Sequence, residues 1–344
     1  MKCIVVTQPG RIEIREVDKP TAGAYQALVR LEAAALCNAT DSKLFLGKFP
    51  GVNDYPLVLG HETVGIVEAV GEQVINFKAG DRVIGGLLGA FSDPCLYSGW
   101  GGFCEYVLVH DHDAMVIAGV DDEAHGWFDA CEIQNVVPED IPVEEAALAC
   151  TWREVLGSFY DFRLMPGNKV IVFGAGPVGL SFVKLGKLFG LGQIDVVDPL
   201  PWKRNLALDM GADHAYKPEE AISTAFLSRE SRSYDTVIDA VGLESVVNAG
   251  LPLLKMTGDL CIYGVMNQNP TLRLSEAPYN FDIHIHQWPT RSEERVAMRL
   301  LSRWIREGKL KASDFVSHRY RMDKITEIFD AVKRGEVIKA ILTF

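Results

Sequence analysis

Short apolar runs separated by Gly, Pro, Asp and Asn occupy the chain up to about Leu148. These runs are residues 3–7, 27–35, 64–70, 82–84 and 103–109. Runs of this length between turn-forming residues are typical of short β-strands. The pattern therefore predicts a β-rich domain in this part of the chain.

The pattern changes at about Asn168, where strand-length apolar runs begin to alternate with amphipathic stretches long enough for helices. The predicted strands are residues 169–173, 193–198, 234–240 and 259–264. Such alternation indicates a parallel sheet with helical crossovers. We therefore expect an α/β protein that combines a β-rich domain with a doubly wound parallel-sheet domain.

After about Thr290 the pattern predicts two helices, over residues 293–307 and 323–334, and a closing strand over residues 337–344. Because the chain ends on a strand, we expect the tail to return to a sheet, that of the first domain. The irregular segment 117–135 is interpreted as an inserted loop or lid.

These patterns divide the chain into three stretches. Residues 1–151 form the first part of the β-rich domain, residues 152–292 form the parallel-sheet domain, and residues 293–344 complete the β-rich domain. A length of 344 residues suits about two domains of roughly 150 residues each.

Composition and charge narrow the function classes. Hydrophobic residues make up 48% of the chain and charged residues 23%, as in ordinary globular proteins. A formal net charge of −12 disfavours nucleic acid and anionic membrane surfaces as partners, because both would repel the protein. The expected partner is a small molecule.

Neither export nor membrane insertion is expected. The first ten residues predict a strand and a turn rather than an apolar signal region, and no stretch approaches about 18 uninterrupted apolar residues. Seven cysteines scattered along the chain do not resemble a disulfide framework. A reducing, cytoplasmic location fits this composition.

A glycine-rich turn follows the predicted strand 169–173 directly and opens a helix. Gly174 allows the tight turn, Gly176 lets the backbone approach a pyrophosphate, and Gly179 lets the helix pack closely on the strand. The anion would bind at the helix N-terminus, which includes Pro177 and Val178. A turn of this kind without a nucleotide is the alternative, but the strand and helix on its two sides favour dinucleotide binding.

Asp198, at the end of the next strand, is placed to accept hydrogen bonds from both ribose hydroxyls and to repel a 2′-phosphate. This favours NAD over NADP. Lys203 and Arg204 follow closely as the start of a helix. They leave NADP open, and Lys203 is included among the candidate cofactor-binding residues.

Four residues in the first domain are of the types that zinc prefers, namely Cys37, His61, Glu62 and Cys150. A thiolate, an imidazole and a carboxylate from distant loops can converge on one ion and leave a position open for substrate, as in a catalytic site. Taken singly, each residue is explained as well by packing, since free cysteines are often buried and a loop histidine is often only hydrogen-bonded. Together with the dinucleotide turn, the set favours one catalytic zinc ion.

Several motifs in this order and spacing resemble the medium-chain dehydrogenase/reductase family, over nearly the whole chain. The similarity is to the zinc-dependent alcohol, sorbitol and galactitol-phosphate dehydrogenase branch. The resemblance implies a GroES-like domain interrupted by a Rossmann domain. The motifs are Gly60-His61-Glu62 with Gly65, Gly80-Asp81-Arg82-Val83, Gly101-Gly102-Phe103-Cys104-Glu105-Tyr106, and the turn at Gly174.

The resemblance also implies roles for individual residues. Cys37 and His61 match zinc ligands, and Glu62 matches a carboxylate that ligates in some members. Cys150 falls where alcohol dehydrogenases have a cysteine and the polyol branch has a glutamate. Thr40 matches the hydroxyl residue that passes the substrate proton, so Thr40 and Glu62 are the candidate catalytic residues.

The chain departs from the family pattern in three places. Two residues rather than one separate Cys37 from Thr40, so a bulge must re-aim a side chain. The lobe that holds four cysteines in many relatives keeps only Cys95 and Cys104, which predicts no structural zinc. Lys43 stands where some relatives have a relay histidine.

The predicted function is hydride transfer between NAD(H) and a secondary alcohol or ketone, with zinc as the Lewis acid and Thr40 on the proton path. A polyol, cyclitol or sugar derivative as substrate, and a homodimer or homotetramer, are implied by the resemblance alone. Two alternatives stay open. The first is a reductase of the same family without catalytic zinc, acting on an activated C=C or a biosynthetic carbonyl, and the second is a non-catalytic dinucleotide-binding protein.

The neighbourhood of Cys150 and the Gly101 turn supply candidate cleft residues. They are Trp100, Trp152, Arg153 and Glu154. Packing explains Trp152 and Glu154 equally well.

Overall fold

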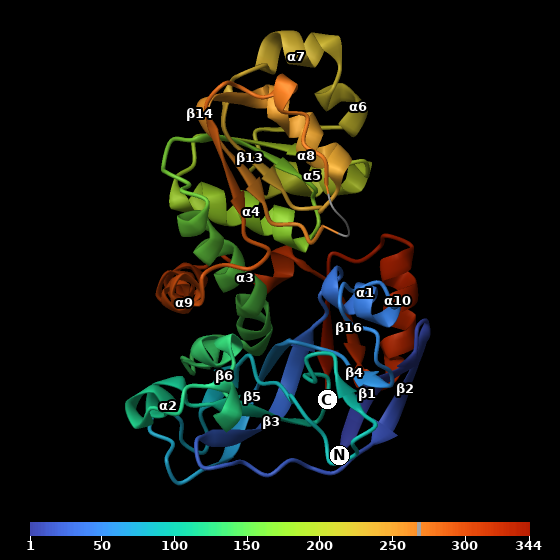
Figure 1. The fold of residues 1–344 in the computed structure, drawn as a ribbon, viewed down its shortest axis with the longest axis vertical. Helices are drawn as coiled ribbons and strands as arrows, with labels where there is room; N and C mark the ends of the chain where they lie inside the picture. Colours follow the sequence, from blue (N-terminus) through green and yellow to red (C-terminus); the bar gives the residue numbers. More distant parts are fainter. Residues whose placement is uncertain (267–269) are drawn as a thin grey trace. The chain divides into compact units, whose positions relative to one another are not determined.

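The computed structural model describes residues 1–266 and 270–344, and the chain forms two compact units (Figure 1). Unit 1 comprises residues 1–150 and 298–344, and unit 2 comprises residues 151–297. Both ends of the chain therefore belong to unit 1. Among the described residues, no helix has the length and apolar character needed to cross a membrane.

Unit 1 contains a four-stranded and a seven-stranded sheet in the described part of the chain. The four-stranded sheet has the order β2-β1-β4-β7. The larger sheet has the order β16-β17-β3-β5-β6-β9, with β8 paired to β3. The bounds of these strands are β1 Lys2–Gln8, β2 Arg11–Glu16, β3 Gln26–Ala35, β4 Leu57–Val58, β5 Glu62–Val70, β6 Arg82–Ile84, β7 Tyr97–Ser98, β8 Tyr106–His110, β9 Asn135–Val137, β16 Val316–Arg321 and β17 Lys339–Thr343.

Helices of unit 1 are few and short, as expected for a β-rich domain. They are α1 Thr40–Phe45, α2 His112–Ala118 and α10 Ile325–Lys333, with 3₁₀ turns η1 Glu123–His125, η2 Asp129–Ile133, η5 Ala312–Asp314 and η6 Met322–Lys324. Two longer helices have residues in both units, α3 Val143–Asp161 and α9 Arg291–Arg306. Helix α10 packs Ile328 and Phe329 into a core that includes Leu44 and Phe103.

Strand β3 is central to the larger sheet because it pairs with β5 on one side and β17 on the other. Ala35 of β3 lies opposite both Glu62 of β5 and Ile341 of β17, and both pairings are antiparallel. In the structure the last strand of the chain thus lies in the sheet that contains β3. Strands β5 and β17 therefore flank the end of β3, just before Cys37.

In its described residues, unit 2 is built on a six-stranded sheet with the order β12-β11-β10-β13-β14-β15, whose strands pair in parallel. This is the 3-2-1-4-5-6 order of the Rossmann sheet. Its elements are β10 Lys169–Phe173, α4 Pro177–Phe189, β11 Gln193–Val197, α5 Pro201–Asp209, β12 His214–Tyr216, α6 Pro218–Ala221, α7 Thr224–Glu230, β13 Tyr234–Asp239, α8 Glu244–Gly250, η3 Leu251–Leu253, β14 Leu254–Ile262, η4 Leu274–Glu276 and β15 Phe281–Ile285.

The parallel sheet is confirmed, but the apolar pattern did not predict its two edge strands. The short β12 contains His214 and Tyr216, and β15 alternates polar Asp282 and His284 with apolar neighbours. An edge strand has one pairing partner and solvent beside it, so it needs no continuous apolar run.

Helix α4 begins directly after the glycine turn because its first residues suit a helix start. Pro177 is the first helical residue, where its missing N–H costs nothing, and Gly190 ends the helix in the left-handed conformation with φ of 99°. Gly179 faces the turn so closely that a Cβ there would lie 1.8 Å from the carbonyl oxygen of Gly174. The helix approaches the turn this closely because position 179 has no side chain.

Cys3 and Cys104 form a disulfide, and both residues are fully buried. They lie opposite each other across an isolated antiparallel bridge between β1 and the segment before β8. This single disulfide is no multi-bridge framework, and the sequence did not indicate it because its two cysteines are 101 residues apart. The other five cysteines are free thiols.

The segment interpreted as a loop or lid is attached to unit 1. It contains η1 and η2, Cys131 within it is buried, and Trp127 donates a hydrogen bond from Nε1 to Nδ1 of His112 at 3.0 Å. At its end the Gln134 side chain accepts from the N–H of His110 and donates to the carbonyl of Gly85. These bonds favour a fixed loop over a lid.

Asp239 ends β13 as a fully buried carboxylate, and it accepts hydrogen bonds from the N–H groups of Val241 and Gly242. Burial raises its pKa from 3.8 to about 6 although these N–H groups act in the opposite direction. Between these two pH values the folded protein binds a proton that the unfolded chain lacks. The contribution of Asp239 to the free energy of unfolding is therefore fully present below pH 3.8, and it is lost as the pH rises through about 6.

We expect Asp239→Asn to remove this pH dependence, since an amide keeps an acceptor oxygen but does not ionise. The free energy of unfolding of the wild type should fall by up to about 3 kcal/mol more than that of the variant between pH 4 and pH 7. Denaturant unfolding of both proteins at the two pH values measures the difference. If the free energy of unfolding changes equally in the two proteins between pH 4 and pH 7, Asp239 does not titrate in this range.

Candidate metal centre and cofactor turn

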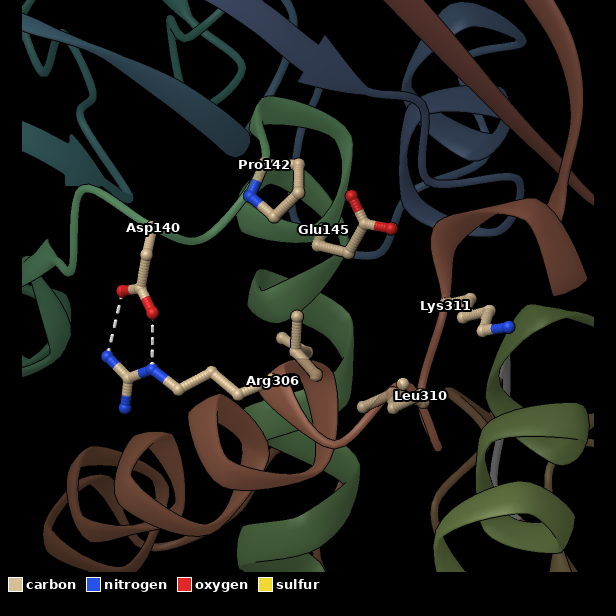
Figure 2. Close-up of a pocket in the computed structure, with 8 residues that line it drawn as sticks. Asp140, Pro142, Glu145, Arg306, Leu310 and Lys311 are labelled. Atoms are coloured by element: carbon tan, nitrogen blue, oxygen red, sulfur yellow. Dashed lines mark hydrogen bonds and ion pairs between the residues drawn. The ribbon is translucent and has the colours of Figure 1, made fainter.

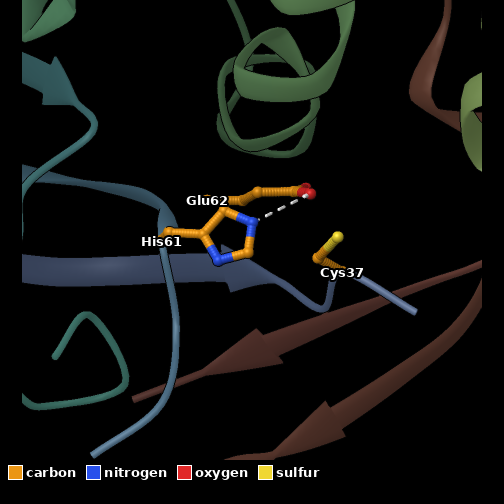
Figure 3. A group of neighbouring side chains, drawn as sticks. All are labelled: Cys37, His61 and Glu62. Atoms are coloured by element: carbon orange, nitrogen blue, oxygen red, sulfur yellow. Dashed lines mark ion pairs between the residues drawn. The ribbon is translucent and has the colours of Figure 1, made fainter. Parts of the chain in front are cut away.

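Three predicted ligands meet in unit 1. Ligand atoms of Cys37, His61 and Glu62 all lie within 4.8 Å of one another (Figure 3). Nε2 of His61 is 4.0 Å from Oε1 of Glu62. A thiol, an imidazole and a carboxylate so close together are a donor set suited to zinc.

The local backbone explains why these side chains converge. Cys37 lies just beyond the end of β3, and Glu62 is the first residue of the neighbouring β5. Gly60 precedes His61 with φ of 99°, and a Cβ there would lie 2.1 Å from the Phe103 ring. Only glycine accommodates both this conformation and this contact, so Gly60 sets the direction in which the chain enters the site.

Asp41 lies behind His61 and is fully buried. Its Oδ2 accepts from the Cys37 N–H at 2.9 Å, and its Oδ1 is 3.6 Å from Nδ1 of His61. Within the described part of the chain, neither Oδ1 of Asp41 nor Nδ1 of His61 has a hydrogen-bond partner. Burial raises the Asp41 pKa to about 7. At many zinc sites a carboxylate on this side of the ring accepts a hydrogen bond from Nδ1 and so orients the histidine. Nε2 of His61 is the ring nitrogen on the side of Glu62.

The sequence offers one signal for Asp41, an acidic residue directly after Thr40, but the sequence analysis did not propose it as a site residue.

We expect Asp41→Asn to weaken zinc binding by roughly 10- to 100-fold, because the amide no longer attracts the Nδ1 proton of His61. Competition with a zinc chelator measures this affinity. Ser42→Ala is the matched control, since the adjacent buried Ser42 hydroxyl has no hydrogen-bond partner. If the wild type, Asp41→Asn and Ser42→Ala bind zinc with equal affinity, Asp41 does not orient His61.

Lys339 is the other site residue that the sequence analysis missed. Its ammonium donates to Oε1 and Oε2 of Glu62 at 2.6 and 2.5 Å and to the carbonyl of Leu36 at 3.3 Å. Burial would lower its pKa, but the Glu62 carboxylate outweighs this and the pKa is raised. No local motif marks Lys339, because its partner is 277 residues away in sequence.

Thr40 begins helix α1, and its hydroxyl and backbone N–H both hydrogen-bond to Cys37. The extra residue between Cys37 and Thr40 is absorbed by a turn in which the N–H of Asp41 donates to the carbonyl of Cys37 at 3.0 Å. Burial, followed by the Glu62 carboxylate, raises the pKa of the Cys37 thiol, whereas Lys339 and Thr40 lower it.

Cys150 is not part of this three-residue cluster. Its buried thiol lies 3.8 Å from the carbonyl of Thr63, the residue after Glu62. The structure thus places it near the strand that carries Glu62 without bringing its sulfur to the other three ligand atoms.

The candidate cleft residues differ in their surroundings. Trp100 is 42% exposed, and its ring stands edge-on to the His61 ring with centroids 6.3 Å apart. Trp152 is fully buried, and Arg153 is buried in an ion pair with Glu294 at 3.0 Å. Trp100 therefore lies beside the metal candidate, whereas packing accounts for Trp152 and Arg153.

In unit 2 the glycine turn lies at the carboxyl ends of the parallel strands, at the point where strand order reverses between β10 and β13. Dinucleotides bind at this point in Rossmann sheets. Gly174 has φ of 102°, which a residue with a side chain rarely adopts. A Cβ on Gly176 would meet no atom of the described residues within 4 Å, so this face of the turn is open toward them.

Asp198 is buried beside this turn, and its carboxylate also holds the backbone in place. Oδ2 accepts from the N–H of Ala175 and Oδ1 from that of Leu200, each at 2.8 Å. Arg204 donates to the backbone carbonyls of Asp198 and Pro199, and Lys203 lies over the Trp202 ring. Each carboxylate oxygen keeps a second lone pair with which to accept from a ribose hydroxyl.

Two other features of the described residues are separate from these sites. Asp259, Asp282 and His284 cluster on β14 and β15, but Asp282 pairs with Arg163 and His284 with Asp259. A pocket of about 540 Å³ in unit 1 is bordered by the bidentate Arg306–Asp140 ion pair (Figure 2). None of its lining residues is a predicted site residue.

Two family models match the chain, the alcohol dehydrogenase GroES-like domain over residues 23–119 and the zinc-binding dehydrogenase over residues 177–302. The chain belongs to the medium-chain dehydrogenase/reductase family. The predicted family, the two-domain fold class and the oxidoreductase class are thereby confirmed.

Full-length relatives agree with this assignment. An alcohol dehydrogenase of Cupriavidus necator is 27% identical, with 98% of this chain and 97% of that protein aligned. A sorbitol dehydrogenase of Bombyx mori is 23% identical over 96% of this chain and 95% of its own length. The crystal structure of galactitol-1-phosphate dehydrogenase from Escherichia coli matches with a TM-score of 0.79 at 22% identity and covers 100% of both chains.

Proposed function

We propose that this protein transfers a hydride between NAD(H) and a secondary alcohol or ketone at a zinc centre formed by Cys37 and His61 with Glu62. The convergence of these three ligand atoms within 4.8 Å is the observation that carries the proposal. The same chain has a dinucleotide-type turn on a Rossmann sheet. The metal candidate therefore belongs to unit 1 and the cofactor turn to unit 2.

The residues present fit a zinc ion. The donor set is of the right kind, and the buried carboxylate of Asp41 faces Nδ1 of His61, the side on which many zinc-binding histidines have a carboxylate. Cys150 is the candidate for a further ligand, as its thiol contacts the residue after Glu62. A bound zinc ion supplies Lewis acidity toward an alcohol or carbonyl oxygen.

Thr40 is the residue that we assign to the proton of the substrate hydroxyl. Its own hydroxyl lies beside Cys37 and can accept one proton while donating another. Lys43 follows three residues later, so it shares a face of α1 with Thr40. Burial lowers the pKa of Lys43, which suits a group near the outer end of a proton path.

Asp198 supports NAD as the cofactor rather than NADP. Its buried carboxylate would face the 2′-position of the adenosine ribose and repel a phosphate there. Arg204 is committed to backbone carbonyls, which weakens the argument for a phosphate site. Fluorescence titration tests this point, and tighter binding of NADPH than of NADH would refute it.

The substrate class is proposed from the relatives, which include enzymes named for sorbitol, D-arabinitol and galactitol-1-phosphate. A polyol, cyclitol or sugar-derived secondary alcohol is the first class to test. We further propose a cytoplasmic homodimer or homotetramer.

The deciding experiment measures zinc and activity on the same preparation. Protein purified in metal-free buffers after growth with zinc should contain about one zinc ion per chain, and NADH oxidation should occur with a panel of ketones and polyol-derived ketoses. Less than a tenth of an equivalent of zinc, with activity unaffected by a chelator, would favour the reductase without catalytic zinc. Cofactor binding with no turnover of any substrate would favour a non-catalytic binding protein.

A further inference from the structure

Trp100 adopts a backbone conformation that large side chains rarely take. Its φ is 74°, in the left-handed region, and Gly101 after it has φ of 71°. For a bulky residue this conformation is strained, and turns that require it normally have Gly, Asn or Asp at such a position. The chain therefore carries a tryptophan where a smaller residue would suit the backbone better.

The surrounding backbone holds Trp100 in this conformation from both sides. The N–H groups of Gly99 and Gly101 both donate to the carbonyl of Val58, at 2.7 and 3.1 Å. The carbonyl of Trp100 accepts from the N–H of Leu88 at 3.3 Å. A Cβ on Gly101 would lie 2.2 Å from the carbonyl oxygen of Leu88, so the turn also packs closely on its neighbour. These contacts fix the direction in which the indole leaves the backbone.

The indole of Trp100 borders the metal candidate and is not part of the core. The residue is 42% exposed, and its ring stands at 70° to the His61 ring, with centroids 6.3 Å apart. A single exposed aromatic residue needs no special explanation. An exposed indole that strained backbone holds beside a candidate ligand does need one, because strain of this kind persists mainly where function depends on it.

We propose that Trp100 is a specificity-determining residue, whose indole provides an apolar surface for the carbon atoms of the substrate and favours secondary alcohols in a ring over open-chain alcohols. The carbon atoms of a substrate whose oxygen binds at the metal candidate would border His61, and hence the indole next to it. This inference rests on the proposed function and narrows its substrate class to cyclitols and cyclic sugar derivatives.

The preference for a ring follows from shape and entropy. An indole offers a large, flat apolar surface, which matches the C–H face of a six-membered ring. A ring already has the shape that packs on such a surface, whereas an open chain must lose torsional freedom to lie flat. A contact of this size changes kcat/KM by about tenfold, or about 1.4 kcal/mol. Because the contact is present before the reaction as well as during it, its loss raises KM more than it lowers kcat.

The test compares alcohols of equal carbon number in the full, zinc-loaded chain with NAD. Cyclohexanol is compared with 2-hexanol, and myo-inositol with sorbitol. The wild type should prefer the ring in kcat/KM by about tenfold or more. Trp100→Asn, whose side chain tolerates a positive φ, should reduce this preference to less than about threefold, through a higher KM for the ring and an unchanged kcat.

Two further variants serve as controls. Trp100→Phe keeps an aromatic surface and should keep the ring preference to within about threefold of the wild type. Trp288→Asn removes another indole, 46% exposed and paired with Arg291, and should leave the preference unchanged. Zinc content and the dissociation constant for NADH should stay at wild-type levels in all three variants, because the indole acts on the substrate alone.

Several results would overturn the role of Trp100. One is a Trp100→Asn protein with the ring preference of the wild type. Another is an equal loss of kcat/KM for ring and open-chain alcohols, with or without loss of zinc, because Trp100 would then support His61 instead of contacting substrate. A wild type that oxidises open-chain alcohols as well as rings would also contradict it. A wild type that binds no zinc, or that turns over none of the four alcohols or their ketones, would refute the proposed function itself, and the role of Trp100 with it.

Discussion

Replacing His61 with alanine should reduce the zinc content below a tenth of an equivalent and lower kcat/KM by about a thousandfold. His61 is the imidazole of the three-residue cluster, and Asp41 behind it would be left as a buried carboxylate facing no base. A thousandfold loss corresponds to about 4 kcal/mol, the scale expected for losing a metal ion that stabilises charge on a reacting oxygen.

His284→Ala is the matched control for His61→Ala. His284 also belongs to a group of three potential ligands, but it is on β15 and its ring is paired with Asp259 at 2.7 Å. Zinc measured by atomic absorption and steady-state rates should stay at wild-type levels in this variant. Full zinc content in His61→Ala would contradict the proposed site, and loss of zinc in His284→Ala would place an ion in unit 2 instead.

Replacing Gly179 with alanine should be the most damaging single methyl group that can be added to the cofactor turn. Its Cβ would lie 1.8 Å from the carbonyl oxygen of Gly174, so backbone must move rather than a flexible side chain. We expect a loss of about 1–3 kcal/mol in stability, as for other overpacked positions. Displacement of the turn should also weaken NADH binding by at least about tenfold, or about 1.4 kcal/mol.

Gly176→Ala separates the two effects, because its added Cβ meets no protein atom within 4 Å. Its thermal unfolding should match that of the wild type, and any change in NADH affinity would report the cofactor alone. Calorimetry and fluorescence titration give both quantities. A Gly179→Ala protein that unfolds and binds NADH like the wild type would mean that the turn shifts without loss of stability, contrary to the close contact between Gly179 and Gly174.

Local patterns sufficed for those parts of the fold in which a residue's neighbours in sequence are also its neighbours in space. The buried run at residues 169–173, the glycines after it and the helix begun by Pro177 lie within one strand–turn–helix unit, and the structure has this unit as expected. The apolar pattern did not predict strands β12 and β15. Each is an edge strand that pairs with one neighbour only, so its apolar pattern is weak.

The metal candidate, too, was predicted from the sequence only in part. Cys37, His61 and Glu62 could be proposed because thiol, imidazole and carboxylate side chains have few common roles together, and the structure brings them together. Cys150 was proposed on the same grounds, yet its sulfur contacts the Thr63 carbonyl. Residue type therefore identified candidates, but it could not say which sulfur would reach the cluster.

By itself, the sequence determined the alternation of strands and helices, the glycine turn and the chemical types of the ligands, because these depend on residues a few positions apart. Only the tertiary structure decided that Asp41 stands behind His61, that Cys3 pairs with Cys104, and that Lys339 faces Glu62. The physical reason is that such contacts join strands paired in a sheet, and the register of that pairing is set by the packing of the whole unit rather than by any segment of it.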